Sequence, residues 1–511
     1  MVMLQTPKQK IAIVILEEFY ARNFLNINVL GGLAQVHDLH LILADGIEIE
    51  ESCVRLFSSV IRYDAEEIRK IRFYVLFNEV LRWRYRSRSK SFVYRESGLY
   101  PTIRKVIALN KFNKRQFSLG NPITAPTNLS DTRFLSRLHN DIILKAQQRL
   151  RWLFLIFARK NTIRVLSFNP FYFCFKIVAN VNKVHAKKLE SILLHIGINQ
   201  IIFPTGGMRP ADLELINIGK SNSITTFFIV ENWDNLSSKT IFWKKPDVLG
   251  TWGPQSTKHA KEIQMFEKSQ IFELGCSRFS RYRDNQIDIA ADQLPINYVV
   301  FVGSIYPYDE FLALKLLDDE ISENQAIYGN LAIIYRPYPG STRSQLFTPE
   351  LFQNVVLDPQ MRLQNEEFSG TYPQGNGALY HGNYEPALSY FPKLINQSRF
   401  FVGGLSSMLI EASLFNKNYL AFAYNEEGCI SSPFAILQGY THFEEISSLH
   451  NLVFCNDIGM LKDVFRKCYS GDFPVNGDIL QEELSYFVVT DVANFGQRLS
   501  AAVNQTKSSI P

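Results

Sequence analysis

Polar side chains that could do acid–base chemistry follow directly after a run of strand-forming residues. The stretch TTFFIV, residues 225–230, leads into Glu231, Trp233, Asp234 and Asn235. A carboxylate at the end of a buried strand can act as a general base, a general acid or a nucleophile. Asp234 is the first candidate for this role and Glu231 the second, with Trp233 and Asn235 on the acceptor side of a cleft. The alternative is structural, because Asp and Asn often cap turns.

A second segment, FVGGLSSMLIEASLFNK, combines a glycine turn with two serines and a glutamate. A strand leads to Gly404, and Ser406 and Ser407 open a helix whose free N–H groups and dipole favour an anion. Glu411 lies one helical turn beyond Ser407, so the two can face the same side. The segment can hold a phosphate and a ribose hydroxyl, and it can equally be a serine-capped core helix.

Three shorter stretches offer further candidates for the same kind of site. In YRPYPGSTR, Arg336 and Tyr338 close a hydrophobic strand, where an arginine can pair with a diphosphate. In LGCSRFSRY, Arg278 would add positive charge beside a flexible backbone. In PTGGMRPAD, Gly206 and Gly207 could form a cleft loop, although paired glycines also mark ordinary tight turns.

The composition excludes several classes of protein. The chain has 511 residues, 46% of them hydrophobic and 20% charged, which indicates two or three folded domains. The six cysteines and nine histidines show no metal-ligand spacing, so we expect no metal site and no cofactor. There is no GxGxxG fingerprint, no P-loop, no signal peptide pattern and no apolar stretch of the roughly 18 residues that span a membrane. A net charge of +5 is too mild to indicate a nucleic-acid partner. These features favour a cytoplasmic protein.

The elements that must position these residues are two series of apolar strands alternating with helical stretches. Such a pattern is typical of doubly wound α/β domains with parallel sheets, which bind ligands beyond the carboxyl ends of their strands. The polar stretch RYRDNQIDIAADQLP is the predicted linker between the two series. The first series lies at 10–18, 38–46, 199–207, 225–234, 246–253 and 269–279. The second lies at 298–304, 331–339, 399–407, 418–424 and 451–457.

A basic aromatic run, LRWRYRSRSKSFVYR, lies in a region of 52–190 that reads as mainly helical and irregular. Arginines interleaved with Trp83 and Tyr85 suit a lipid headgroup interface on the inner face of a membrane. The alternative is a solvated positive face.

Taken in order, these segments resemble bacterial surface-polysaccharide glycosyltransferases of the GT-B architecture, from a WDN turn through PD…WG and G-x-x-RF-x-x-Y to RPxP and a paired-serine motif. The resemblance covers roughly 200–430 and the first strand. Its relatives include sialyl- and Kdo-transferases that use CMP-activated sugars, and polyol-phosphate transferases. The HP motif of the CMP-sugar group reads Tyr338-Pro339 here, and the family's RFD reads RFS.

The resemblance implies an acceptor-binding domain at 1–285, a nucleotide-sugar-binding domain at 296–480, and a C-terminal helix at 481–511 that packs back on the first domain. Donor contacts would come from Arg278, Arg336, Tyr338, Gly404, Ser406, Ser407 and Glu411. The implied activity is metal-independent transfer of a sugar from a CMP- or UDP-linked donor to a growing lipopolysaccharide, O-antigen or capsule glycan. Polyol-phosphate transfer, sugar-nucleotide epimerisation and a non-catalytic glycan- or lipid-binding scaffold stay open as alternatives.

Overall fold

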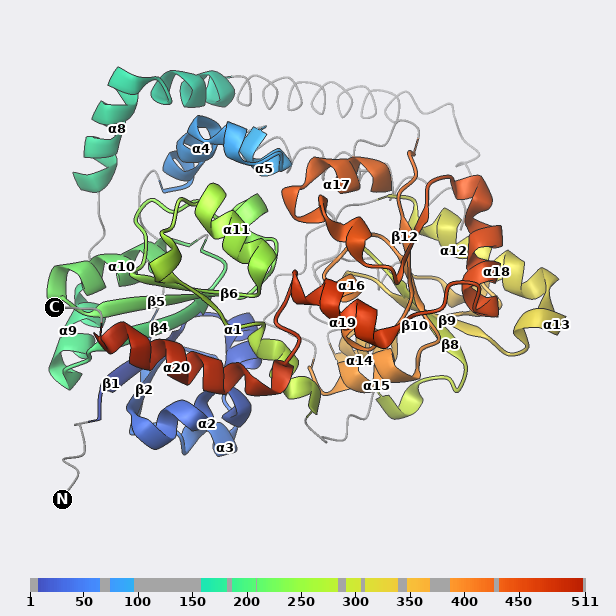
Figure 1. Cartoon of the computed structure of the whole chain (residues 1–511), viewed down its shortest axis with the longest axis horizontal. Helices are drawn as coiled ribbons and strands as arrows, with labels where there is room; N and C mark the ends of the chain where they lie inside the picture. The colour runs from blue at the N-terminus through green and yellow to red at the C-terminus, as the bar shows by residue number, and fades with distance from the viewer. Residues whose placement is uncertain are drawn as a thin grey trace, which may run out of the picture.

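The computed structural model describes residues 8–64, 74–95, 158–181, 186–207, 209–283, 291–304, 308–338, 347–367, 387–426 and 432–508. Two parallel sheets lie side by side, each with helices on both faces (Figure 1). The doubly wound α/β, GT-B-type fold predicted from the sequence is therefore confirmed.

The first sheet has seven parallel strands in the order β3-β2-β1-β4-β5-β6-β7. The inner strand β1 carries Ile11, Ile13 and Ile15 on one face and Ala12 and Val14 on the other, and all five side chains are buried. This two-sided burial explains why the strands read as continuous apolar runs. The strands are β1 (Lys10–Ile15), β2 (Asp38–Ala44), β3 (Ser59–Tyr63), β4 (Gln200–Thr205), β5 (Thr225–Val230), β6 (Val248–Thr251) and β7 (Ile271–Glu273).

The second sheet has six parallel strands in the order β10-β9-β8-β11-β12-β13. After β8 the chain adds β9 and β10 on one side of it and then β11, β12 and β13 on the other. The strand order therefore reverses between β8 and β11, and folds of this kind bind ligands at such a switch point. The strands are β8 (Tyr298–Val302), β9 (Ala332–Arg336), β10 (Val355–Leu357), β11 (Phe401–Gly403), β12 (Tyr419–Phe422) and β13 (Leu452–Cys455).

Helices cover the sheets in the manner expected of this fold. On the first sheet these are α1 (Glu18–Phe24), α2 (Ile27–Val36), α3 (Glu51–Val54), α9 (Lys187–Ile196), α10 (Pro210–Asn222) and α11 (Pro254–Glu262). The second domain contains α12 (Glu310–Glu323), α13 (Gln325–Tyr328), α14 (Pro359–Glu367), α15 (Tyr390–Gln397), α16 (Met408–Leu414), α17 (Pro433–Gly439), α18 (Leu461–Ser470) and α19 (Gly477–Ser485).

The last helix, α20 (Phe495–Ser508), returns from the second domain and lies along the first, next to α2 (Figure 1). Phe495, Leu499 and Val503 are buried in the same core as Ile11 and Leu41. A Cβ on Gly496 would come within 2.4 Å of the carbonyl oxygen of Asn28, so the two helices meet at backbone distance. The chain therefore joins its domains twice.

Two strands were missing from the sequence prediction. Strand β3 lies inside the region predicted as helical and irregular, and β10 has only three residues. Both are edge strands with partly exposed side chains, which weakens the apolar pattern that identifies a strand. The predicted linker contributes short 3₁₀ turns at residues 281–283 and 291–293, and its residues 284–290 lie outside the described part of the chain.

Candidate active site

Glu231 is buried among neutral hydrogen-bond donors. It follows β5 directly and is 1% exposed. Asn23 of α1 donates its Nδ2 hydrogen to Oε2 of Glu231 at 3.2 Å, and the Ser277 hydroxyl lies 3.0 and 3.1 Å from the two carboxylate oxygens. Three segments distant in sequence thus hold one carboxyl group in a fixed orientation.

Burial raises the pKa of Glu231 to about 7. The hydrogen bonds from Ser277 and Asn23 and the charges of Arg278 and Arg22 oppose this shift without cancelling it. A carboxyl group with a pKa near the working pH can both take up and give back a proton, which suits a general acid or base.

Asp234 has a different environment, although it lies only three residues further on. Burial alone would raise its pKa, but Lys239, at 2.7 Å, together with His442 and the Ser238 hydroxyl, keeps the pKa below its ordinary value. The Asp234 carbonyl oxygen also accepts from Ser238, within the π-helical turn that spans Asn235–Lys239. The geometry favours Glu231 over Asp234 as the proton-transferring residue, the reverse of the order expected from the sequence.

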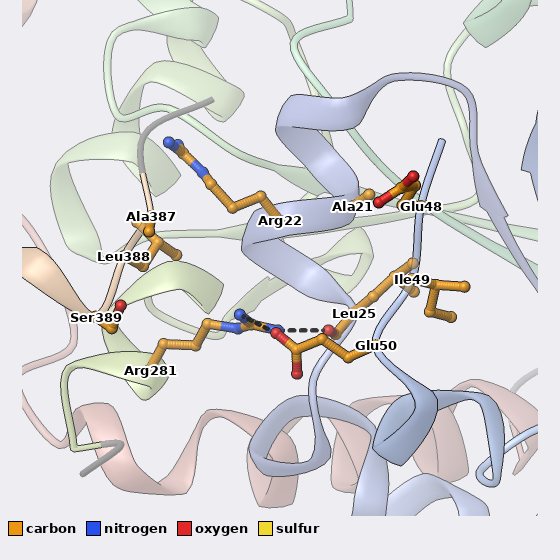
Figure 2. A pocket seen from close by; sticks show the side chains of 10 residues that line it. All are labelled: Ala21, Arg22, Leu25, Glu48, Ile49, Glu50, Arg281, Ala387, Leu388 and Ser389. Carbon is orange, nitrogen blue, oxygen red and sulfur yellow. Dashed lines mark hydrogen bonds and ion pairs between the residues drawn. The ribbon is translucent and has the colours of Figure 1, made fainter. Parts of the chain in front are cut away.

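A cavity of about 230 Å³ lies between the domains (Figure 2), and Glu231 is not among the residues that line it. The first domain lines it with α1, the segment 48–50 and Arg281, and the second domain with residues 387–389. Arg281 donates to Glu50 at 3.0 Å and to the carbonyl oxygen of Leu25 at 2.8 Å. Arg22, also on the wall, donates to Oδ1 of Asn23 at 3.1 Å. A chain of hydrogen bonds therefore runs from the cavity wall through Asn23 to Glu231.

The predicted donor contacts Arg278 and Glu411 lie together, across the domain interface. Nη2 of Arg278 is 2.9 Å from Oε1 of Glu411, and both side chains are less than one-tenth exposed. The hydroxyl of Tyr282 donates to the other oxygen of Glu411. Glu411 is thus engaged by two residues of the first domain, and a ribose hydroxyl would have to compete with them.

Arg336 ends strand β9 in a second buried ion pair. Its Nη1 lies 2.7 Å from Oδ2 of Asp358, and its Nη2 donates to Gln360 at 3.0 Å. The guanidinium also lies over the ring of Phe391, 4.6 Å from the ring centre. The arginine stands at the carboxyl end of its strand, as predicted, with its charge balanced by a carboxylate. Tyr338, two residues on, is 37% exposed.

The glycine–serine turn connects β11 to α16 at the switch point of the second sheet. Gly403 has φ = 143°, and a Cβ there would lie 2.3 Å from the carbonyl oxygen of Val302, so only glycine fits. Gly404 packs against Ser304 and Tyr308. Ser406 and Ser407 are half-buried, and the Ser407 side chain makes no capping bond to the short helix that follows.

The remaining predicted cleft residues pack inside the protein. Trp233 is 3% exposed and its ring meets those of His442, Phe443 and Phe487 of the second part of the chain. Asn235 is also buried.

The glycine pair forms a closed loop. Tyr20 accepts a hydrogen bond from the Gly206 backbone, and Gly207 has φ = 68° with Thr240 and Phe228 close by. Neither glycine lines the cavity. Both are better explained as packing positions.

Asn23 and Arg22 were missed by the sequence analysis. They follow the first strand within a helix, ARNF, where nothing in the pattern distinguishes them from solvated polar residues. Their position after the inner strand β1, whose carboxyl end lies at the same edge of the sheet as that of β5, is the one signal available. Within the described residues, no group of three or more His, Cys, Asp or Glu side chains could hold a metal ion.

No family model matches this sequence, and no curated protein sequence matches it. Among solved structures, the UDP-GlcNAc 2-epimerase from Neisseria meningitidis bound to UDP-GlcNAc is similar at 10% identity and a TM-score of 0.47, over 97% of this chain and 100% of that one. The calicheamicin glycosyltransferase CalG4 is similar at 8% identity and a TM-score of 0.42, over 98% of both chains. The wall teichoic acid polymerase TagF is similar at 11% identity and a TM-score of 0.33, over 61% of this chain and 90% of that one. At these values the comparisons concern overall architecture, and the chemistry has to be inferred from the residues of this chain.

Proposed function

We propose that this chain is a glycosyltransferase that moves a sugar from a nucleotide-activated donor to a hydroxyl group of a growing surface glycan. The observation that carries the proposal is Glu231, a carboxyl group at the domain interface with a pKa of about 7. Asn23 and Ser277 orient it, and Asn23 connects it by hydrogen bonds to Arg22 on the wall of the interdomain cavity.

In the proposed mechanism Glu231 is the general base. The acceptor hydroxyl would enter from the cavity and replace the Ser277 hydroxyl as hydrogen-bond donor to the carboxylate. As the hydroxyl oxygen bonds to the anomeric carbon, its proton passes to Glu231 and the bond from that carbon to the donor phosphate breaks. Arg22 and Arg281 would orient the polar groups of the acceptor at the cavity wall.

The donor would bind to the second domain. A nucleotide diphosphate or monophosphate would contact Ser406, Ser407 and the backbone at Gly404, with Tyr338 nearby in the chain. Arg336 and Arg278 would contribute positive potential while keeping their carboxylate partners. CMP-linked sugars such as CMP-Kdo, or UDP-linked sugars, are the donors we propose, and lipopolysaccharide, O-antigen or capsule is the acceptor class.

The test begins with the donor. Thermal unfolding is measured with CMP, CDP, UDP and GDP, because a ligand that binds only the folded state raises the melting temperature. Each nucleotide-linked sugar that matches a stabilising base is then incubated with the protein, with and without a bacterial polysaccharide fraction. Sugar found on the polysaccharide supports the proposal.

Three other outcomes would overturn it. Transfer of a polyol phosphate from a CDP-linked donor would assign the alternative phosphotransferase activity. Interconversion of a UDP-sugar without an acceptor would assign an epimerase. Binding of polysaccharide without turnover of any donor would assign the scaffold.

A further inference from the structure

Helix α8 (Asn169–Val181) lies at the edge of the first domain (Figure 1), and several of its apolar side chains are exposed. Its inward side packs through Phe175, whose ring centre is 5.4 Å from that of Phe77 on α4 (Tyr74–Arg84). Phe171, one turn before Phe175, is 52% exposed, and Phe173 and Ile177 on the opposite side of the helix are 65% and 50% exposed. A surface helix normally turns polar residues outward, so this arrangement marks an interaction surface.

The exposed apolar surface continues into the turn before α8. Phe168 is 64% exposed and Val165 is 53% exposed. We call the exposed apolar side chains Val165, Phe168, Phe171, Phe173 and Ile177, which project from more than one side of this segment, the α8 face. Among the described residues, no helix has the length and apolar character that crossing a bilayer requires. The α8 face could therefore act on a membrane only from its surface.

Among the described residues, the exposed charges of α8 and of the segment before it are positive, and the nearby Glu79 of α4 is buried and paired with Arg159 at 2.8 Å. Residues 158–181 include Arg164 and Lys176, both exposed, and no Asp or Glu. The neighbouring stretch 82–95 also lacks acidic residues. Arg164 and Arg86 both lie over the ring of Trp83, at 5.4 and 4.7 Å from its centre. Apolar side chains bordered by cations match a surface of anionic lipid headgroups over acyl chains.

The basic aromatic run itself is largely turned toward the protein. Arg82 donates to the carbonyl oxygen of Lys239, Arg84 to that of Ser167, and Arg88 lies over the ring of Tyr85. These arginines hold α4 and its neighbours together. The surface suited to a lipid headgroup interface therefore lies on α8 instead of on the run that the sequence singled out.

We propose that the α8 face docks the protein on an anionic phospholipid bilayer, with its phenylalanines inserted at the level of the headgroups. A second copy of the chain fits this face less well, because a symmetric contact would bring the Arg164 and Lys176 side chains of both copies together. The inference does not depend on the proposed function, since it concerns binding to lipid and not turnover.

Co-sedimentation with vesicles tests the proposal. One set of vesicles contains equal parts of phosphatidylglycerol and phosphatidylcholine, and the other contains phosphatidylcholine alone. We expect binding to the mixed vesicles and at least about tenfold weaker binding to the neutral ones. The triple variant Phe171→Ser, Phe173→Ser, Ile177→Ser should lose at least about tenfold in affinity for the mixed vesicles, because three apolar side chains no longer insert.

The matched control is the triple variant Ile296→Ser, Leu312→Ser, Ile327→Ser, which removes three exposed apolar side chains from the second domain. It should bind as the unmodified chain does. The proposal is overturned if the unmodified chain binds neither kind of vesicle, or if the α8 and control variants bind equally well. It is also overturned if light scattering shows a dimer without lipid that the α8 variant dissociates, because the face would then serve self-association.

Discussion

The two domains hold carboxylates at their shared interface in opposite ways. On the first-domain side, Glu231 accepts hydrogen bonds from an amide and a hydroxyl. On the second-domain side, Glu411 accepts from Arg278 across the interface, and Asp358 accepts from Arg336 within the second domain. Ser277 and Arg278 are neighbours in the chain, yet the serine serves Glu231 while the arginine crosses to Glu411. The positive charge that could neutralise Glu231 is therefore committed elsewhere.

A carboxyl group with neutral partners, such as Glu231, is suited to proton transfer. Carboxylates paired with a guanidinium, such as Glu411 and Asp358, are suited to a structural role. A buried carboxyl group with neutral partners has a pKa close to 7, so both protonation states are within reach. A buried carboxylate with a guanidinium partner forms an interaction that is costly to break from one side. Substitutions of these carboxylates therefore test whether the partner of each one determines its effect on activity and on stability.

The largest effect is expected for Glu231→Gln. Removing a general base typically costs 10²- to 10⁴-fold in rate, so kcat/KM for sugar transfer should fall by about a thousandfold. Asp234→Asn is the matched substitution, and its loss should be far smaller because Asp234 already pairs with Lys239. Steady-state kinetics on both variants, with melting temperatures to verify folding, decide the assignment. Full activity in Glu231→Gln would remove this residue from the mechanism.

The next largest effect is expected for Glu411→Gln. The substitution leaves Arg278 buried without its charged partner, which should lower the free energy of unfolding by about 3–5 kcal/mol. Denaturant titration measures the change. Glu51→Gln is the control, since the Glu51–Arg55 pair is 88% and 78% exposed and should contribute nothing measurable. Equal stability of Glu411→Gln and the unmodified chain would contradict a structural role for the buried pair.

A smaller effect is expected on the pH dependence of Ser277→Ala. If Glu231 is a base, kcat/KM rises with pH as the carboxyl group loses its proton, with a midpoint near its pKa of about 7. The Ser277 hydroxyl stabilises the ionised form, so removing it should move the midpoint upward by about one pH unit. Ser280→Ala is the control, because its hydroxyl donates to the backbone of Ser277 and not to Glu231. An unchanged midpoint would mean that Ser277 does not tune this group.

The smallest effect is expected at the rim of the same interface. Lys258 pairs with Glu445 across the domains at 2.7 Å, with side chains 43% and 33% exposed. Lys258→Ala should change the free energy of unfolding by less than about 1 kcal/mol, because water screens the pair. Denaturant titration beside Glu411→Gln gives a direct contrast. If Lys258→Ala lowered the free energy of unfolding as much as Glu411→Gln does, burial of an ion pair would not determine its contribution to stability.

Much of the fold could be predicted because buried parallel strands leave a strong pattern. Runs such as KIAIVI and TTFFIV are apolar on both faces, and they became β1 and β5. Edge strands β3 and β10 were not predicted, because half-exposed strands lack that pattern. The site was harder to predict. Glu231 could be singled out by its type and position, but Asn23 lies more than 200 residues from Glu231, and nothing in the sequence predicts their 3.2 Å contact.

The pattern of residues is enough to predict two doubly wound domains, the residues at the carboxyl ends of their strands, and the apolar and basic character of the region around α8. The different roles of those residues depend on how the folded chain packs around them. Glu231 and Asp234 are both carboxylates behind the same strand, and their side-chain types alone predict similar acidity. Only the packing gives one of them neutral donors and the other a lysine, which is why one pKa rises and the other falls.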